Sequence, residues 1–363
     1  MKKILIIIGK LYIGGAERVA RDIGVFADKS KYEIHYLVFE SKIGPYEADV
    51  EAAGCRVIHM DNPSDGYGTY VRSLMRLIRR ERYDVIHCHT MFNSGWAVLV
   101  GWLCGVPVRI AHSHSIRGFE KRSFLKNSYE KTMRRLILVF ATDLVACGEK
   151  AGERLYGKKA FDKRGILIYN GIDLQPFVFD KQKRTAVREQ LNVVGGFVVG
   201  HAGHLAKVKN QEFLIRLLPD LLKKEHDTHL LLLGDGKDRS MLKELADELD
   251  VAEHVHFTGN VNNVGDYMSA MDVFAFPSLY EGTPLALIEA QANGLPCIVS
   301  EKIPTDAVLT DLVIRLPLEH EQWLAPLLNA KRTENCQSLE IVKEKGFDVR
   351  VMLDKIYRLY EGH

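Results

Sequence analysis

Two carboxylates, Glu281 and Glu289, flank a stretch whose residue types suit the start of a helix. Thr283 is the expected N-cap and Pro284 the expected first helical residue, because a threonine oxygen caps unpaired amides and proline needs no amide partner there. A helix start presents unpaired N–H groups and a positive dipole end, which suit a phosphate. Residues 276–290 therefore predict either a nucleotide-sugar site or an ordinary capped helix.

A second loop with chemical potential, residues 203–210, follows an expected strand and contains Gly203, His204 and Lys209. Lys209 would lie at the start of the next helix, beside the positive end of the helix dipole. That position is unfavourable for a cation unless an anion is bound between them. The loop therefore predicts an anion site, with solvated surface lysines as the alternative.

Glycine-rich turns follow three other expected strands. They are 9–17, which contains Gly14 and Gly15, 234–236, and 257–261, which contains Gly259 and Val261. Glycine lets the backbone approach a ligand closely. The first turn matches neither the dinucleotide fingerprint nor a P-loop, and each turn alone is common in folded proteins.

Histidines occur in two close pairs, His87 with His89 and His112 with His114, each at the end of an expected strand. Strand alternation directs both members of a pair to the same face. No carboxylate motif of the kind that metal enzymes use accompanies them, so no metal is predicted. The six cysteines show no metal or disulfide spacing, and we expect them to be reduced core residues.

Composition and charge indicate a two-domain globular protein. The chain has 363 residues, of which 47% are hydrophobic, and its net charge is +2. Basic residues outnumber acidic ones by 28 to 18 up to residue 170, whereas the remainder has 21 against 29. We find no signal peptide and no membrane-spanning run, which predicts a cytoplasmic protein.

Strand and helix patterns alternate along the chain, which is typical of parallel sheets with crossover helices. We expect an α/β fold of two doubly wound, Rossmann-like domains that face each other across a cleft, with ligands at the carboxyl ends of the strands. The expected domains are residues 1–170 and 171–345. Residues 346–363 are expected to form a C-terminal helix, for which packing back toward the first domain is one arrangement. Residues 174–183 are expected to form a linker.

A basic, partly apolar segment extends from residue 117 to residue 140 and is expected to lie on the first domain. Its membrane-facing candidates are Arg117, Lys121, Arg122 and Lys126. Such a segment suits an anionic membrane surface, with a solvated basic helix face as the alternative. Nucleic acid is not an expected partner, because no binding motif accompanies the charge.

Taken together and in order, these motifs resemble the family-4 retaining glycosyltransferases of the GT-B fold. The resemblance covers essentially the whole chain. Residues 13–17, 109–114 and 278–284 resemble the members that make exopolysaccharides and capsular polysaccharides. It implies transfer of a hexosyl or N-acetylhexosaminyl group from a nucleotide-sugar, expected to be a UDP-sugar, to a polysaccharide-precursor or lipid-linked acceptor. The nucleotide-sugar is then a substrate, and no cofactor is expected.

The resemblance also implies roles for individual residues. Glu281, Lys209 and His114 would act on the reacting sugar and diphosphate, with His112 as the alternative to His114, and Glu289 would bind the ribose. The donor would further contact Gly14, Gly15, Gly203, His204, Gly259, Val261, Gly282, Thr283, Pro284 and Leu285. Retention would follow a front-face reaction in which the leaving phosphate helps to deprotonate the acceptor.

His204 departs from the family pattern, which usually has arginine there. A histidine is a weaker diphosphate clamp than a guanidinium. The absence of an Asp-x-Asp motif from the sequence favours metal-independent transfer.

Two rival hypotheses remain. One is a nucleotide-sugar epimerase or hydrolase, and the other is a non-catalytic two-domain sugar-binding protein. A peripheral location on the inner face of the plasma membrane is compatible with all of the transferase features.

Overall fold

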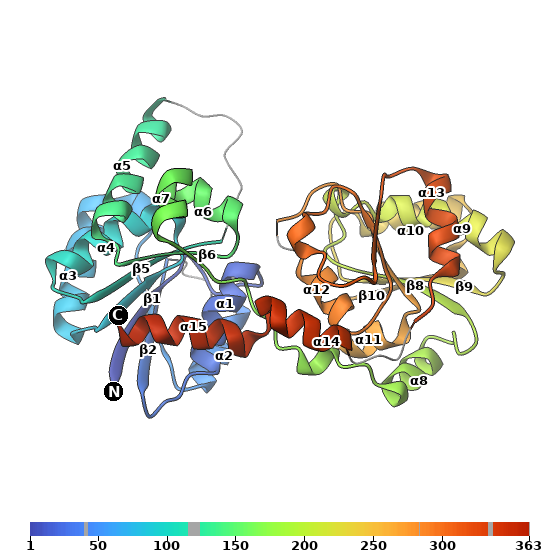
Figure 1. Ribbon diagram of the computed structural model, residues 1–363, viewed down its shortest axis with the longest axis horizontal. Helices are drawn as coiled ribbons and strands as arrows, with labels where there is room; N and C mark the ends of the chain where they lie inside the picture. Colours follow the sequence, from blue (N-terminus) through green and yellow to red (C-terminus); the bar gives the residue numbers. More distant parts are fainter. Residues whose placement is uncertain (40–42, 115–123, 283, 333–336, 363) are drawn as a thin grey trace. The chain divides into compact units, whose positions relative to one another are not determined.

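The computed structural model describes residues 1–39, 43–114, 124–282, 284–332 and 337–362. The chain divides into two compact units, the first formed by Met1–Gly171 together with Val349–His363 and the second by Ile172–Asp348 (Figure 1). Each unit contains one parallel sheet covered by helices. The expected fold class, two Rossmann-like α/β domains, is confirmed.

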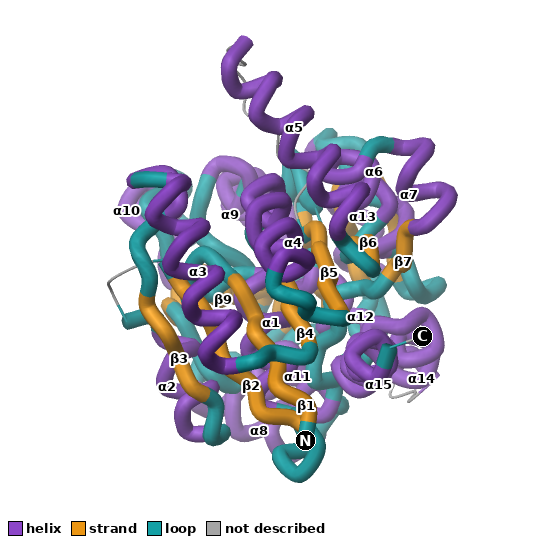
Figure 2. Tube along the Cα trace, turned by 90° about the vertical axis from the view of Figure 1, so that its left-hand side faces the viewer, coloured by secondary structure: helices purple, strands orange, loops and turns teal. Residues whose placement is uncertain are grey.

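The first unit contains a seven-stranded parallel sheet (Figure 2). From edge to edge its strands are β3 (Arg56–His59), β2 (Tyr32–Val38), β1 (Lys2–Ile7), β4 (Val85–Cys88), β5 (Val108–Ser113), β6 (Asp143–Ala146) and β7 (Gly165–Leu167). The strand order reverses between β1 and β4. In doubly wound sheets, ligand sites form at the carboxyl ends of the strands beside such a reversal.

Helices cover both faces of this sheet because alternate residues of each strand point to opposite faces. In β1, Ile4 and Ile6 pack into the core on one face, and Leu5 and Ile7 into the core on the other. The first face carries α1 (Gly15–Val25), α2 (Pro45–Ala52) and α15 (Val349–Glu361). The second carries α3 (Tyr67–Glu81), α4 (Ser94–Leu103), α5 (Phe124–Phe140), α6 (Glu149–Tyr156) and α7 (Lys158–Arg164).

The C-terminal helix α15 is an integral part of the first unit, although it is distant from α1 and β2 in the sequence (Figure 1). Its Tyr357 hydroxyl donates a hydrogen bond of 2.8 Å to the carbonyl of Ile23, and its ring stacks on Tyr32 at 5.0 Å. Tyr360 is completely buried. These contacts fasten α15 against the sheet and α1.

The second unit contains a six-stranded parallel sheet whose order reverses between β8 and β11. From edge to edge its strands are β10 (Val255–Gly259), β9 (Thr228–Leu233), β8 (Phe197–Ala202), β11 (Val273–Phe276), β12 (Cys297–Ser300) and β13 (Val313–Leu316). Its helices are α8 (Lys181–Gln190), α9 (Gln211–Lys224), α10 (Arg239–Glu248), α11 (Val264–Ala270), α12 (Leu285–Ala292), α13 (His320–Asn329) and α14 (Gln337–Val342). The core on one face is completed by α9, α10 and α13.

Three elements differ from the sequence expectation. The end of the expected linker is helical, because α8 begins at Lys181, capped by the Asp180 side chain, which accepts from the amides of Gln182 and Lys183. Strand β13 pairs with β12 in a stretch to which the sequence analysis assigned no strand. The short α7 follows α6 and was not expected.

Within the described parts of the chain, we find no helix with both the length and the apolar composition that a membrane span requires.

Candidate functional site

The start of α12 is shifted from its expected position by one residue. Pro284 is the N-cap, with φ −78° and ψ 80°, and helical geometry begins at Leu285. The prediction that Pro284 is the first helical residue is therefore wrong, because its ψ is not helical. The expected N-cap, Thr283, lies outside the described residues. The first amides of α12 still lack partners within the helix, so the positive end of its dipole remains near Gly282 and Leu285.

Lys209 and Glu281 come together beside this helix start. Lys209 Nζ lies 2.7 Å from Glu281 Oε1, and the two side chains are 20% and 10% exposed. The ammonium also lies 5.1 Å from the centre of the Phe276 ring. The sequence predicted an anion beside Lys209. In the structure Lys209 contacts the Glu281 carboxylate, a pairing that the sequence analysis did not predict.

Hydrogen bonds to main-chain carbonyls hold the two loops that carry this pair. The amide of Leu279 donates to the carbonyl of Val208 at 2.8 Å, and Asn210 Nδ2 donates to the carbonyl of Pro277 at 3.3 Å. The loops follow the adjacent strands β8 and β11, so both leave the same edge of the sheet. The ion pair is thus positioned by main-chain geometry as well as by its own attraction.

Sequence reasoning missed His201 and Gln211, two buried residues that support the loop of residues 203–210. His201 donates from Nδ1 to the carbonyl of Ala275 at 2.9 Å, which leaves Nε2 to accept from Gln211 Nε2 at 3.2 Å. Gln211 Nε2 also donates to the carbonyl of His204 at 3.1 Å. Burial, opposed by the bond to Ala275, lowers the pKa of His201 to about 4. The signal available in the sequence was a histidine near the carboxyl end of a strand, at a position where the side chain faces the interior.

The glycines of the second unit permit close packing of its loops. Gly234 has a φ of +125°, and a Cβ there would lie 2.3 Å from the Gly203 carbonyl oxygen. A Cβ on Gly236 would lie 2.2 Å from the Leu205 carbonyl oxygen. The Gly234 amide donates to the carbonyl of Gly259 at 2.9 Å. The turns after β8, β9 and β10 are therefore packed side by side.

The remaining candidates of the second unit lie at the same edge or within α12. Val261 follows β10 and is partly exposed, and His204 is exposed. Glu289 is 8% exposed and lies one turn inside α12. The structure thus brings Lys209 and Glu281 into direct contact and places the other candidates on neighbouring loops.

In the first unit, the expected glycine turn caps α1. Gly14 is the N-cap in an extended conformation, and α1 begins at Gly15. A Cβ on Gly14 would lie 2.3 Å from the Glu17 carboxylate, whereas a Cβ on Gly15 would make only ordinary contact with Asn170. Because the Glu17 carboxylate is the end of a flexible side chain that can move aside, local packing alone does not require glycine at either position.

His112 and His114, the two alternatives for one role, have different environments. His112 is 1% exposed and contacts His87, with 3.1 Å between His112 Nδ1 and His87 Nε2. His114 is partly exposed and contacts His89 and Asn170 at 2.8 and 3.3 Å. A ligand in solution therefore reaches His114 more readily than His112.

The membrane-facing candidates are only partly described. Arg117, Lys121 and Arg122 lie outside the described residues, whereas Lys126 lies in the first turns of α5 and is half-buried. Beside it, Phe124 and Leu125 are 86% and 79% exposed. The start of α5 thus offers an apolar as well as a basic surface.

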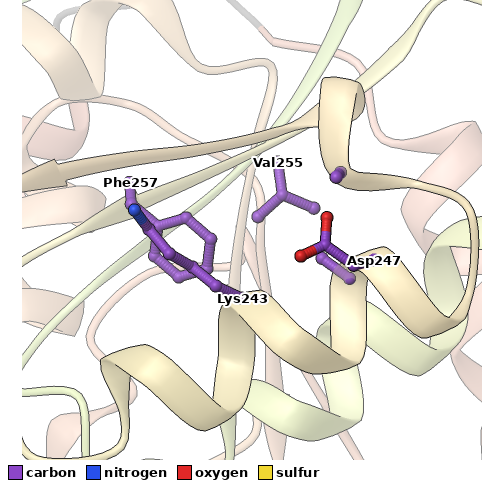
Figure 3. A pocket seen from close by; sticks show the side chains of 6 residues that line it. Lys243, Asp247, Val255 and Phe257 are labelled. Atoms are coloured by element: carbon purple, nitrogen blue, oxygen red, sulfur yellow. The ribbon is translucent and has the colours of Figure 1, made fainter.

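A pocket of about 390 Å³ opens between α10 and β10 (Figure 3). Lys243, Asp247, Val255 and Phe257 line it, and Lys243 Nζ lies 5.9 Å from the centre of the Phe257 ring. Val255 begins β10, so the pocket lies toward the amino end of that strand. It is therefore distinct from the candidate residues at the carboxyl edge.

Comparison with known proteins gives matches over nearly the entire chain. The family model described as glycosyl transferases group 1 matches residues 183–323, and that described as glycosyltransferase family 4 matches residues 13–176. EpsF of Bacillus subtilis, named as a glycosyltransferase, is 32% identical over an alignment 375 residues long. That alignment covers 99% of this chain and 96% of EpsF. CapH of Staphylococcus aureus, a capsular polysaccharide biosynthesis glycosyltransferase, is 24% identical, with 99% of each chain covered.

Among solved structures, the crystal structure of HepE from Anabaena in complex with UDP superposes with a TM-score of 0.79. Its sequence identity is 21%, and 100% of each chain is covered. At this identity the likeness establishes a shared fold.

We predict that His201 makes the stability of the second unit depend on pH. Its pKa of about 4 in the folded state lies below the usual value of 6.5, so between these values the unfolded chain binds the proton and the folded chain does not. Stability therefore falls as the pH decreases from 6.5 toward 4. The maximal slope is roughly 1.4 kcal/mol per pH unit.

Denaturant unfolding of the wild type and of His201→Gln between pH 7.5 and 4.5 measures this effect. The variant lacks the titrating imidazole, so its stability should decrease less steeply with acidification. Parallel profiles for the two proteins would show that His201 does not titrate as its burial requires.

Proposed function

The chain belongs to the family-4 glycosyltransferases of the GT-B fold, and we propose that it transfers a sugar from a UDP-sugar to a polysaccharide precursor or a lipid-linked saccharide. The transferred group is of the hexosyl or N-acetylhexosaminyl class. The observation that carries the proposal is the contact of Lys209 Nζ with Glu281 Oε1, 2.7 Å apart, beside the amide-rich start of α12.

The groups at Lys209, Glu281 and the start of α12 suit a nucleoside-diphosphate sugar. Lys209 and the first amides of α12 would stabilise the negative charge that develops on the departing diphosphate, as preorganised electrostatic groups. Glu281 would then exchange the ammonium for hydroxyls of the donor sugar, and Glu289 would accept from the ribose hydroxyls. This division of roles places charge stabilisation on the loop after β8 and sugar orientation on the loop after β11.

A UDP-sugar is the first donor to test. UDP is bound in the crystal structure of HepE, which shares the fold, and this supports the choice of nucleotide. The resemblance to capsular and exopolysaccharide enzymes supports a saccharide acceptor. We propose metal-independent transfer with retention, in which the departing phosphate assists removal of the acceptor proton.

We predict that Lys209→Ala and Glu281→Ala each reduce sugar transfer by about 100-fold or more, because each removes a group that contacts the reacting charge or sugar. The fold should persist, since both residues lie on loops at the edge of the sheet and neither belongs to the hydrophobic core of the second unit. Initial rates and thermal unfolding measured on the same preparations separate activity from stability.

Lys223→Ala is the matched control, because Lys223 is 75% exposed at the far end of α9 and pairs only locally with Asp220. It should retain wild-type rates. Full activity in Lys209→Ala or in Glu281→Ala would refute the site assignment.

A screen of UDP-, GDP- and ADP-sugars by thermal shift is expected to select UDP-sugars. The reason is mass action, since a ligand that binds only the folded protein raises the unfolding temperature. Product analysis without acceptor tests the rival enzymes, because an epimerase or hydrolase would release an epimer or free sugar. Stabilisation by free sugars, with none by nucleotides, would support the non-catalytic alternative instead.

The proposed acceptor reaches the enzyme at an anionic membrane surface on the inner face of the plasma membrane. Exposed Phe124 and Leu125, next to Lys126 at the start of α5, support that location. We predict that the protein sediments with vesicles containing anionic lipid, less so at high salt, and not with neutral vesicles. Equal recovery in the supernatant with both vesicle types would contradict membrane attachment.

A further inference from the structure

Four histidine side chains gather at the carboxyl ends of β4 and β5 in the first unit. The two strands pair in parallel with His87 opposite Ile110, so both histidine pairs project from the same face. Neighbouring rings in the group have centroids 4.0 to 5.3 Å apart. His87, His89 and His112 are 0%, 6% and 1% exposed. The proposed sugar transfer assigns no role to His87 or His89. It involves His112 only as the alternative to His114.

A chain of hydrogen bonds defines the proton positions on one side of the group. Asn170 Oδ1 accepts from His114 Nδ1 at 3.3 Å, so His114 Nε2 carries a lone pair. His89 Nδ1 donates to that lone pair at 2.8 Å, which leaves a lone pair on His89 Nε2. This Nε2 is buried and has no hydrogen-bond partner among the residues that the structure describes. An unpaired acceptor in a dry interior is costly and requires an explanation.

A second chain ends in the same way. His87 Nδ1 lies 2.7 Å from the Tyr360 hydroxyl of α15, and His87 Nε2 lies 3.1 Å from His112 Nδ1. His112 Nε2 is also buried and finds no partner within the described parts of the chain, whichever way the protons are arranged along this series of hydrogen bonds. When Tyr360 accepts the proton of His87 Nδ1, both His87 Nε2 and His112 Nε2 carry lone pairs.

We propose that His87, His89 and His112 form a binding site for a divalent transition metal of the zinc class, with a structural role in the first unit. One ring nitrogen from each residue lies within 4.8 Å of the other two. Nitrogen ligands of tetrahedral zinc are roughly 3.3 Å apart, given Zn–N bonds of about 2.0 Å. Small rotations of the three side chains therefore suffice to close the site.

The surroundings suit such an ion in two respects. All three side chains are buried, and a dry interior favours the neutral imidazole, which is the form that coordinates a metal. The outer nitrogens of His89 and His87 contact His114 and Tyr360, as the orienting partners of metal-bound histidines do. Three imidazoles leave the fourth position to water or an anion.

The ion would join β4 to β5 and, through Tyr360, to α15. The proposed diphosphate ligands Lys209 and Glu281 belong to the other unit, whereas His114, a candidate for the sugar site, contacts the proposed ligand His89. Metal retention is therefore measured directly on the bound ion and sugar transfer by initial rates, so that the failure of one is distinguishable from the failure of the other.

The test uses the full-length protein without a histidine tag, stripped with a chelator and then dialysed against Zn²⁺. Metal analysis should find about one ion per chain. His89→Gln and His112→Gln should each abolish retention. His114→Ala, which removes only an outer partner, should weaken binding by about 10–100-fold.

The matched control is His254→Gln/His256→Gln in the second unit. There His229, His254 and His256 also gather, with ring centroids 5.1 and 5.3 Å apart from that of His229. This double variant should retain the ion. Loss of the ion in the control, or no retention by the wild type, would overturn the proposal.

Binding of Co²⁺ to the wild type provides a measurement that needs no variant. Four-coordinate Co²⁺ with imidazole ligands absorbs strongly in the visible range, and Zn²⁺ should displace it. A spectrum identical to that of Co²⁺ in buffer would equally overturn the proposal.

Discussion

The reversal of strand order between β8 and β11 is the constraint on which the candidate site depends. Because these two strands are adjacent and parallel, the loops that follow them leave the same edge of the sheet. The hydrogen bond from the Leu279 amide to the Val208 carbonyl joins these loops near their tips. Lys209 and Glu281, 72 residues apart in the sequence, meet as a direct result.

The ion pair itself contributes more to position than to stability. Both groups are largely removed from water, and the loss of hydration offsets much of their attraction. Its value is that the Glu281 carboxylate compensates the ammonium of Lys209, which directly precedes the start of α9 and would otherwise be repelled by the positive end of that helix dipole. In the proposed reaction, a diphosphate takes over this compensation, so the loop need not be rebuilt when the donor binds.

Buried histidines in the two units illustrate opposite solutions to the same problem. His201 has a partner at each ring nitrogen, the Ala275 carbonyl and Gln211, and thereby supports the loop that contains His204. His89 and His112 each keep one buried nitrogen for which the described residues offer no partner. A satisfied histidine is explained by the fold alone, whereas an unsatisfied pair points to a ligand.

The sequence by itself determined the two-domain α/β fold, the glycine turns and the candidate residues at the carboxyl ends of the strands. Such features depend on local periodicity and turn chemistry, which are readable along a chain. It did not reveal β13 or α8, because short elements carry little periodic signal. Tertiary structure alone decided that Lys209 pairs with Glu281 and that two histidine pairs form one group, because both depend on which strands are neighbours. Strand order is set by packing of the whole sheet, and no residue pattern within a single strand encodes it.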